Sequence, residues 1–368
     1  MSSHNAVVKV PFNALRPGED AADVKTAIDR VLASGWFILG PEVEAFESEF
    51  AAASGVPYAV GVGTGTDAIT LILRALDIGP GDEVITPPLS AAYSALAIMM
   101  AGARPVFADI DPDRLTLDPR LTEAAITSRT RAIMPVHLYG QAADMRPLEA
   151  IAARHNLALI EDAAQAHLAT ADGRPVGTIG IAAASSFYPT KNLGAAGDGG
   201  AVLTRDAQLA ARVKRLRNGG QVTRYQHDEF GVNSRLDEMQ AAILRARLKY
   251  LPAWTAKRRA IAKKYRMTLD GASVATPKEF DPGHVYHLFP LLTGARDRFQ
   301  VHMKDHGIET LIHYPVPIPR QPALQSTTPA MCGVADRVCA QVVSLPMYPG
   351  LSDAAVTAVA EAAATFGG

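Results

Sequence analysis

The stretch that decides the fold is DAAQAHLATADGRPVGTIGIAAASSFYPTK, which runs from Asp162 to Lys191. Asp162 ends the apolar run LALIE, which has the length and composition of a buried parallel strand. A carboxylate at such a strand end lies at the crevice where open α/β sheets bind ligands. Gln165 is expected one helical turn further on, facing the same side. A second short apolar segment then leads to Ser186, Tyr188 and Lys191.

The residue types in this stretch match the groups that pyridoxal phosphate (PLP) requires. Its aldehyde needs an amine for a Schiff base, and its pyridine nitrogen needs an anion, so Lys191 and Asp162 are the candidates. Gln165 can donate a hydrogen bond to the phenolic oxygen of the ring, and Ser186 can bind part of the phosphate. Taken singly, each residue is more often structural: Asp162 would be a buried cap and Lys191 a solvated surface lysine. Because all the ligand types occur together at one strand end, we favour a cofactor site.

A second anion site is expected in YAVGVGTGTDAITLILRALDIG, which begins at Tyr58. Here a short apolar strand enters a Gly/Thr turn and then a helix N-terminus, where backbone N–H groups favour an anion. The candidate phosphate ligands are Gly65 and the backbone of Thr66 and Asp67, together with the Thr66 hydroxyl. Glycine turns are common, so this pattern gains its weight from Lys191 downstream.

Strands and helices alternate ahead of Asp162. DEVITPP, RPVFADI, RAIMPVHLY and LALIED are typical of strands, and SAAYSALAIMMAGA, PRLTEAAI and MRPLEAIAARH of helices. This βαβ order predicts an α/β fold with a mostly parallel sheet and helices on both faces. Two further helices are expected before it, AADVKTAIDRVLAS and a helix from Pro41 to Gly55. The proline in LPAW, residues 251–254, indicates a boundary between a large domain (1–250) and a small domain (251–368), to which the N-terminal segment can also contribute.

Charge and composition argue against several classes of protein. The net charge of −1 gives no global field for nucleic acid or an anionic membrane. The basic residues between Arg212 and Arg266 are mostly expected on solvated helix faces. Cys332 and Cys339 fit neither a metal site nor a disulfide framework, which favours a cytoplasmic protein. No signal peptide or membrane span is expected.

Six strings, PVHLYGQ, IEDAAQAH, SFYPTKNLGA.GDGGAV, G.NSRLDE.QAAIL, VYHLF and GI.T.IHYPVP, occur in this order along the chain. In these motifs the chain resembles the sugar aminotransferases among the fold-type I PLP enzymes, from about Gly35 to Pro349. The resemblance implies a small C-terminal α+β domain, and a lysine rather than a histidine at Lys191 implies transamination. It also implies a homodimer with composite sites, in which Asn233 reaches the partner's cofactor phosphate. By itself, Asn233 would be a turn former.

The resemblance further implies a substrate pocket and a reaction. The residues that would line the sugar and diphosphate pocket are Tyr188, Arg224, Arg235, His313 and Tyr314. L-Glutamate would donate the amine, and SFYPTKNLGA.GDGG resembles relatives that aminate the 3-keto carbon, which implies a dTDP-linked 3-keto-6-deoxyhexose. The alternatives are a 4-keto nucleotide sugar, an inosose, or a PLP-binding protein without turnover. One departure is Ala91, where many relatives carry an aromatic residue over the cofactor ring; Tyr93 is the nearest substitute.

Overall fold

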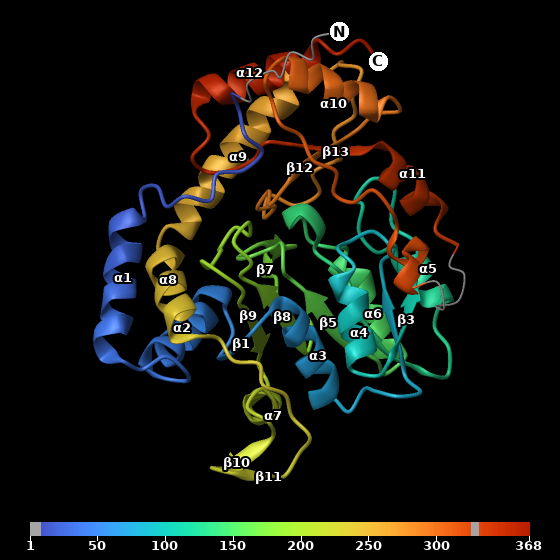
Figure 1. The fold of residues 1–368 in the computed structure, drawn as a ribbon. Coiled ribbons are helices and arrows are strands. Elements are labelled where there is room, and N and C mark those ends of the chain that lie inside the picture. Colours follow the sequence, from blue (N-terminus) through green and yellow to red (C-terminus); the bar gives the residue numbers. More distant parts are fainter. Residues whose placement is uncertain (1–8, 325–330) are drawn as a thin grey trace.

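The computed structural model describes residues 9–324 and 331–368 (Figure 1). Part of the strand-like segment expected at the start of the chain falls on residues 1–8 and lies outside the described residues. Both early helices are confirmed, α1 (Ala21–Ser34) and α2 (Pro41–Ser54). Each ends at a glycine in the left-handed region, Gly35 and Gly55, which ends a helix without the steric penalty that a Cβ would bring.

A seven-stranded sheet forms the centre of the molecule. Strand β9 is antiparallel to both of its neighbours, β1 and β8, and the other neighbouring strands are parallel to each other. The expected α/β fold with a mostly parallel sheet is therefore confirmed. In spatial order the strands are β1 (Tyr58–Val62), β9 (Gly200–Thr204), β8 (Ala182–Ser186), β5 (Ala158–Asp162), β4 (Thr130–Ile133), β2 (Glu83–Thr86) and β3 (Arg104–Phe107).

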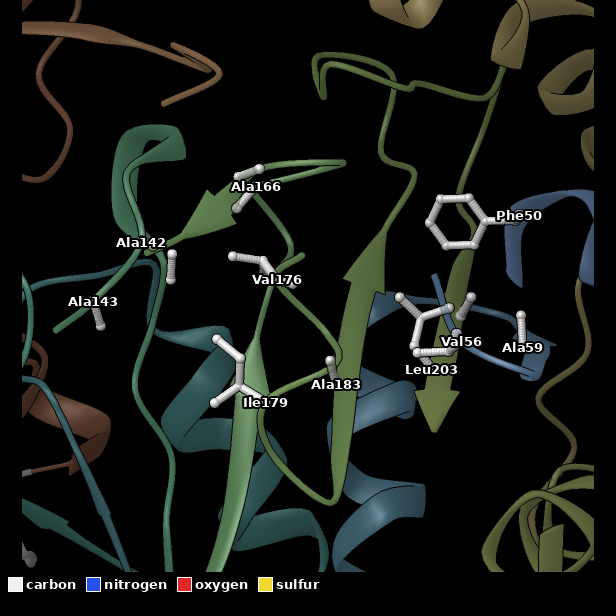
Figure 2. Close-up of a cluster of buried hydrophobic side chains, with 14 of the residues drawn as sticks. Phe50, Val56, Ala59, Ala142, Ala143, Ala166, Val176, Ile179, Ala183 and Leu203 are labelled. Carbon is white, nitrogen blue, oxygen red and sulfur yellow. The ribbon is translucent and has the colours of Figure 1, made fainter. Parts of the chain in front are cut away.

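Helices cover both faces of this sheet, as the βαβ order predicts. Alternate strand residues face opposite sides, so that Ala183 and its partner Leu203 belong to one core while Ala184 and Val202 belong to the other. Figure 2 shows Phe50, Val56 and Leu203 together in the first of these cores. Helices α2, α6 (Met145–Arg154) and α8 (Glu238–Leu248) pack on that face, and α3 (Gly65–Ala75), α4 (Tyr93–Met100) and α7 (Ala207–Leu216) pack on the other.

A separate hydrophobic core gathers the C-terminal part of the chain. Tyr265, Phe289 and Phe299 are among its buried members, and Val10 joins them from the N-terminal segment, which forms a bridge to Ile308. In Figure 1 the two described ends of the chain lie at this same end of the molecule. The division at 251–254 stays a prediction. The elements here are α9 (Leu251–Thr268), β12 (Phe289–Leu292), α10 (Arg296–Asp305), α11 (Gly333–Gln341), β13 (Val342–Leu345) and α12 (Asp353–Ala364).

The remaining elements are short. Strands β10 and β11 form a hairpin that projects from the body beside α7 (Figure 1). Their bounds and those of the others are α5 (Pro119–Ala124), η1 (Leu138–Gly140), β6 (Thr170–Ala171), β7 (Arg174–Pro175), β10 (Gln221–Thr223), β11 (Gln226–His227), η2 (Ile318–Arg320) and η3 (Pro322–Leu324).

One expectation from the sequence is wrong in detail. Gln165 does not lie on a helix, because the chain after β5 runs through turns before β6. Not all of the basic residues lie on solvated faces: Arg217 is buried in an ion pair with Glu47, and Arg258 is buried against backbone carbonyls.

Neither a membrane-spanning helix nor a metal cluster is found in the described part of the chain. Within residues 9–324 and 331–368, no helix has the length and apolar character needed to cross a bilayer. The same residues contain no group of three or more His, Cys, Asp or Glu side chains placed to hold a metal ion. Cys332 and Cys339 are both free and buried.

Candidate active site

The predicted cofactor residues meet at one edge of the sheet. Ser186 pairs with Gly200 across β8 and β9, and Gly200 pairs with Val62 across β9 and β1. Asp162 pairs with Ala184, two residues before the end of β8. Since β1, β8 and β5 all point the same way, their carboxyl ends and the start of α3 lie together at the edge where α/β sheets bind ligands.

The loop that carries Lys191 is anchored at its base by an aromatic cluster. Phe187 is fully buried, and its ring packs edge-on against Phe46 and Phe50 with centroids 5.3 and 5.2 Å apart. The amide of Lys191 donates to the Tyr188 carbonyl at 2.8 Å, which closes a turn. Nη1 of Arg247, from α8, donates to the Gly194 carbonyl at 2.6 Å. The loop is therefore held from both ends.

The environment of Lys191 favours a neutral amine. Burial lowers the pKa of Lys191 to about 8, and the negative charge of Asp162 opposes this shift. Burial also lowers the pKa of His313 to about 4, with a smaller contribution from the positive Lys191. His313 is thus neutral at physiological pH, and roughly a tenth of Lys191 is unprotonated at neutral pH, far more than of a surface lysine. An unprotonated amine is the nucleophilic form that attacks a carbonyl.

Asp162 is buried at the end of β5 and is held by two donors. The Ser94 hydroxyl donates to Oδ2 at 2.7 Å, and the Ala164 amide donates to Oδ1 at 3.1 Å. Asp162 forms no salt bridge with any residue that the structure describes, so its charge is available to a ligand. Ser94 was not predicted, because it lies in the first turn of α4 after β2, and only the strand order places it beside Asp162.

Gln165 connects the sheet edge to the predicted substrate residues. Its Oε1 accepts from the Tyr139 amide at 2.7 Å, and its Nε2 donates to the Tyr314 hydroxyl at 3.0 Å. The Tyr139 hydroxyl in turn donates to the carbonyl of His313. The structure therefore brings Gln165, His313 and Tyr314 together, and one N–H of the Gln165 amide is left for a ligand.

The start of α3 lies unusually close to β8. A Cβ added to Gly65 would lie 2.6 Å from the Cβ of Ser186, so no other residue fits here. The Thr64 hydroxyl accepts from the Asp67 amide at 3.0 Å. The Asp67 amide, which was predicted to bind the phosphate, therefore has a partner within the chain. The amides of Gly65 and Thr66 have no intrahelical carbonyl to bind, and Gly65 lies against the Ser186 side chain. Two amides and a hydroxyl at a helix N-terminus fit the phosphate of PLP.

Three other predicted residues form no hydrogen bond with this group within the described part of the chain. Arg224 is exposed in the β10–β11 hairpin, where its guanidinium lies 5.1 Å from the ring centre of Tyr225. Asn233 is exposed and bridges Asn218, and Arg235 donates to the Asn218 side chain at 3.0 Å.

The aromatic residues near Lys191 and Ala91 are largely open to solvent. Tyr188 is 52% exposed and Tyr93 is 64% exposed. Helix α4 begins at Tyr93, two residues after Ala91. The prediction that Tyr93 takes the place of the aromatic residue missing at Ala91 stays a prediction.

Two residues beside Lys191 were missed. The side chain of Asn192 donates to the Val285 carbonyl at 3.0 Å, and its Oδ1 lies 3.2 Å from Nδ1 of His287. Burial holds the pKa of His287 well below its ordinary value, so the ring is neutral. His287 lies inside the VYHLF motif, which was noted for the family resemblance without a role for its histidine. The pair fixes the loop immediately after Lys191.

A partly buried lysine whose pKa responds to a nearby aspartate, beside a glycine-requiring helix N-terminus on a mostly parallel sheet, is the arrangement that a fold-type I PLP enzyme needs. The chain belongs to the DegT/DnrJ/EryC1/StrS aminotransferase family, whose model matches residues 19–364. It is therefore an aminotransferase, and the resemblance seen in the sequence is confirmed.

Three known proteins illustrate this similarity. The chain is 48% identical to dTDP-3-amino-3,4,6-trideoxy-alpha-D-glucose transaminase of Streptomyces venezuelae, over 95% of this chain and 94% of that protein. The crystal structure of DesV from S. venezuelae matches with a TM-score of 0.93 and 48% identity, covering 96% of this chain and 97% of that one. The structure of NtdA from Bacillus subtilis, with bound cofactor PMP, matches with a TM-score of 0.91 and 32% identity, covering 98% and 86%.

Proposed function

We propose that this aminotransferase moves the amino group of L-glutamate to the 3-keto carbon of a dTDP-linked 6-deoxyhexose. The observation that carries the proposal is the partly buried Lys191 in the electrostatic field of Asp162, in a chain that is 48% identical to a dTDP-3-amino-sugar transaminase. The reaction has two halves, because glutamate first leaves its amine on the enzyme and departs as 2-oxoglutarate. The keto sugar then takes the amine, which gives ping-pong kinetics.

Pyridoxal phosphate is the cofactor, and it supplies the electron sink for both halves. Lys191 attaches it and moves a proton to and from the substrate carbon. Asp162 holds the proton on the pyridine nitrogen, and Ser94 orients Asp162. Gln165 donates to the phenolic oxygen, and Gly65, Thr66 and Ser186 bind the phosphate. The burial and hydrogen bonds described above support these assignments.

The exposed position of Asn233 supports a composite site in a homodimer. Its neighbour Ser234 is buried and donates to the Asp67 carboxylate at 2.8 Å, which places this segment beside the start of α3. The Asn233 side chain faces solvent from that position and is free to contact a second copy of the chain. Arg224, on its projecting hairpin, has the same freedom. We place the enzyme in the cytoplasm.

The substrate is tested by single-turnover assays. Enzyme loaded with the amine is mixed with dTDP-3-keto, dTDP-4-keto and UDP-3-keto sugars and with an inosose, and the change in cofactor absorption is followed. We expect the dTDP-3-keto sugar to react at least about ten-fold faster than the dTDP-4-keto sugar, because a displaced carbonyl loses its attack geometry. The UDP sugar and the inosose should also react more slowly, because they carry another nucleotide or none. Faster reaction of the 4-keto sugar would overturn the proposed regiochemistry. Faster reaction of the inosose would overturn the proposal that the substrate carries a nucleotide. A protein that reacts with glutamate but with no keto compound would contradict the whole proposal.

Mixed dimers test the composite site. Lys191→Ala and Asn233→Ala homodimers are each expected to be impaired. After dissociation and reassembly together, each mixed dimer should contain one intact site if Asn233 serves the partner's cofactor. Activity should then return to about a quarter of the wild-type value, since half of the dimers carry one working site of two. If mass spectrometry shows mixed dimers and activity stays absent, Asn233 does not act across the interface.

A further inference from the structure

The turn formed by Tyr139 and Gly140 lies in the PVHLYGQ motif, next to the cofactor edge of the sheet. Both residues have left-handed backbone conformations, with φ of 59° and 96°. This conformation is uncommon for a residue other than glycine, and it persists only where the surrounding structure holds it. A buried tyrosine held in this way is a candidate for a functional role.

Contacts on two sides fix the backbone of this turn. The Tyr139 amide donates to Oε1 of Gln165 at 2.7 Å, and the Tyr139 carbonyl accepts from the Leu288 amide at 3.3 Å. A Cβ added to Gly140 would lie 2.8 Å from the backbone nitrogen of His287, so only glycine allows the two segments to pass this closely. The turn therefore joins the cofactor edge of the sheet to the VYHLF motif.

The segment of residues 312–316 depends on this turn for its position. It includes His313 and one further predicted substrate residue. Within the described part of the chain, the backbone of these five residues forms a single hydrogen bond, in which the His313 carbonyl accepts from the Tyr139 hydroxyl. The backbone is next bonded to other parts of the molecule at Leu311 on one side and at Ile318 on the other. The Tyr139 hydroxyl is thus the backbone anchor of the predicted sugar-binding segment.

Four residues close a ring of contacts, which we term the Tyr139 frame: Tyr139, Gln165, Tyr314 and His313. Gln165 binds the Tyr139 amide through Oε1, and its Nε2 donates to the Tyr314 hydroxyl at 3.0 Å. The Tyr139 hydroxyl completes the ring at His313. Burial raises the pKa of Tyr139 well above its ordinary value, so this hydroxyl keeps its proton at any physiological pH. The frame therefore links the predicted cofactor residue Gln165 to the sugar-binding segment without any exposed contact of Tyr139.

We propose that Tyr139 is a positioning residue that holds the acceptor sugar in register with the cofactor and so decides which ring carbon is aminated. This inference rests on the proposed function, because it names the residue that sets the regiochemistry of the keto-sugar half. The Tyr139 amide orients Gln165, and its hydroxyl holds His313. A displacement of about 1 Å at a reacting carbonyl can cost about 100-fold in rate. A loosened segment is therefore enough to weaken the choice between neighbouring ring carbons.

Tyr139→Phe removes the hydroxyl and keeps the ring and the backbone contact with Gln165. In the keto-sugar half, started from amine-loaded enzyme, we expect the half-saturating sugar concentration to rise about ten-fold, which is the effect of one lost hydrogen bond. The ratio of the rates with dTDP-3-keto and dTDP-4-keto sugars should move at least about three-fold towards one, whichever sugar the wild type prefers. The glutamate half should change by less than about two-fold, since the Gln165 contact is retained.

Tyr265→Phe is the matched control. Tyr265 is also buried, and its hydroxyl donates to the Pro346 carbonyl at 2.9 Å, away from the Tyr139 frame. Both variants lose one buried bond between a phenol and a carbonyl, so both should lower Tm by a similar small amount. Tyr265→Phe should leave the sugar ratio and both half-reactions as in the wild type. A change of the ratio in both variants would show a general effect of stability and would overturn the inference.

Hydrogen exchange gives a readout that does not depend on turnover. In Tyr139→Phe the amides of residues 311–318 should exchange at least about ten-fold faster than in the wild type, while those of the central sheet are unchanged. Unchanged exchange in this segment, faster exchange throughout the sheet, or an unchanged sugar ratio would each overturn the inference while leaving the aminotransferase reaction intact. A wild type that reacts with glutamate but with no nucleotide sugar would instead contradict the proposed function, and the regiochemical role of Tyr139 with it.

Discussion

Replacing Lys191 with alanine is expected to lower turnover by at least about 10⁴-fold, the upper end of what general acid–base catalysis contributes. The loss should be this large because the same amine both attaches the cofactor and moves the proton. The pKa of about 8 shows why this lysine is suited to the task, since a surface lysine is almost fully protonated at neutral pH. Lys257 lines a pocket beside Lys191, but it forms an ion pair with Glu19 at 2.8 Å and is not placed to replace Lys191.

Three measurements check this expectation. Initial rates with glutamate and a keto sugar give the loss of turnover. Borohydride reduction followed by peptide mass spectrometry should locate the cofactor on Lys191 in the wild type and on no residue in the variant. Lys304→Ala, on the exposed side of α10, is the matched control and should behave as the wild type. Normal activity in Lys191→Ala would contradict the catalytic role of this lysine and the proposal that it attaches the cofactor.

The regular part of the fold could be predicted from local patterns. Apolar runs separated by helical periods gave the strands β2 to β5 and the helices between them, because each βαβ unit encodes its own alternation. Proline at the start of α2 and glycine after it gave both ends of that helix. The order of strands in the sheet does not depend on local sequence. Contacts between segments far apart in the sequence therefore could not be predicted.

The contact of Ser94 with Asp162 is one of these. They are 68 residues apart in the chain, and nothing in the helix around Ser94 distinguishes its hydroxyl from other serines. The approach of Gly65 to Ser186 is another, for a glycine in a turn usually serves the turn itself. Here it is required because the backbone of α3 passes within contact of β8.

The burial of Arg258 was not foreseen, although the sequence held a signal for it. The buried residues of α9 include Thr255, Ile261 and Tyr265, and Arg258 shares their helical face. When the basic residues are considered together as one run, the place of Arg258 on the buried face of the helix is overlooked. A cation on the apolar face of a helix is better treated as a buried group than as a solvated charge. Asn233 and Arg224 are a different case, since their roles depend on a second chain.

Replacing Asp162 with asparagine is expected to keep the fold and lower turnover by roughly 10²–10³-fold. Asparagine has nearly the same shape: its Oδ1 can still accept from the Ala164 amide, and its Nδ2 can donate to the Ser94 hydroxyl, which then accepts instead of donating, so packing is preserved. It carries no charge, and an opposite charge at this distance raises the affinity of a pyridine nitrogen for its proton by about 1–3 pKa units. Turnover should fall because the cofactor accepts electrons well only when that nitrogen is protonated.

A second readout separates this electrostatic role from a structural one. Asp162 raises the pKa of Lys191 against the effect of burial, so removing its charge should lower the pKa of Lys191 below the wild-type value of about 8. The rate at which apoenzyme is labelled by pyridoxal should then rise at lower pH in Asp162→Asn than in the wild type. Ser94→Ala, which removes one hydrogen bond and no charge, should lower turnover only about five- to ten-fold and leave this pH profile in place. Turnover of Asp162→Asn within a factor of about two of the wild type, with an unshifted profile, would make Asp162 a structural cap.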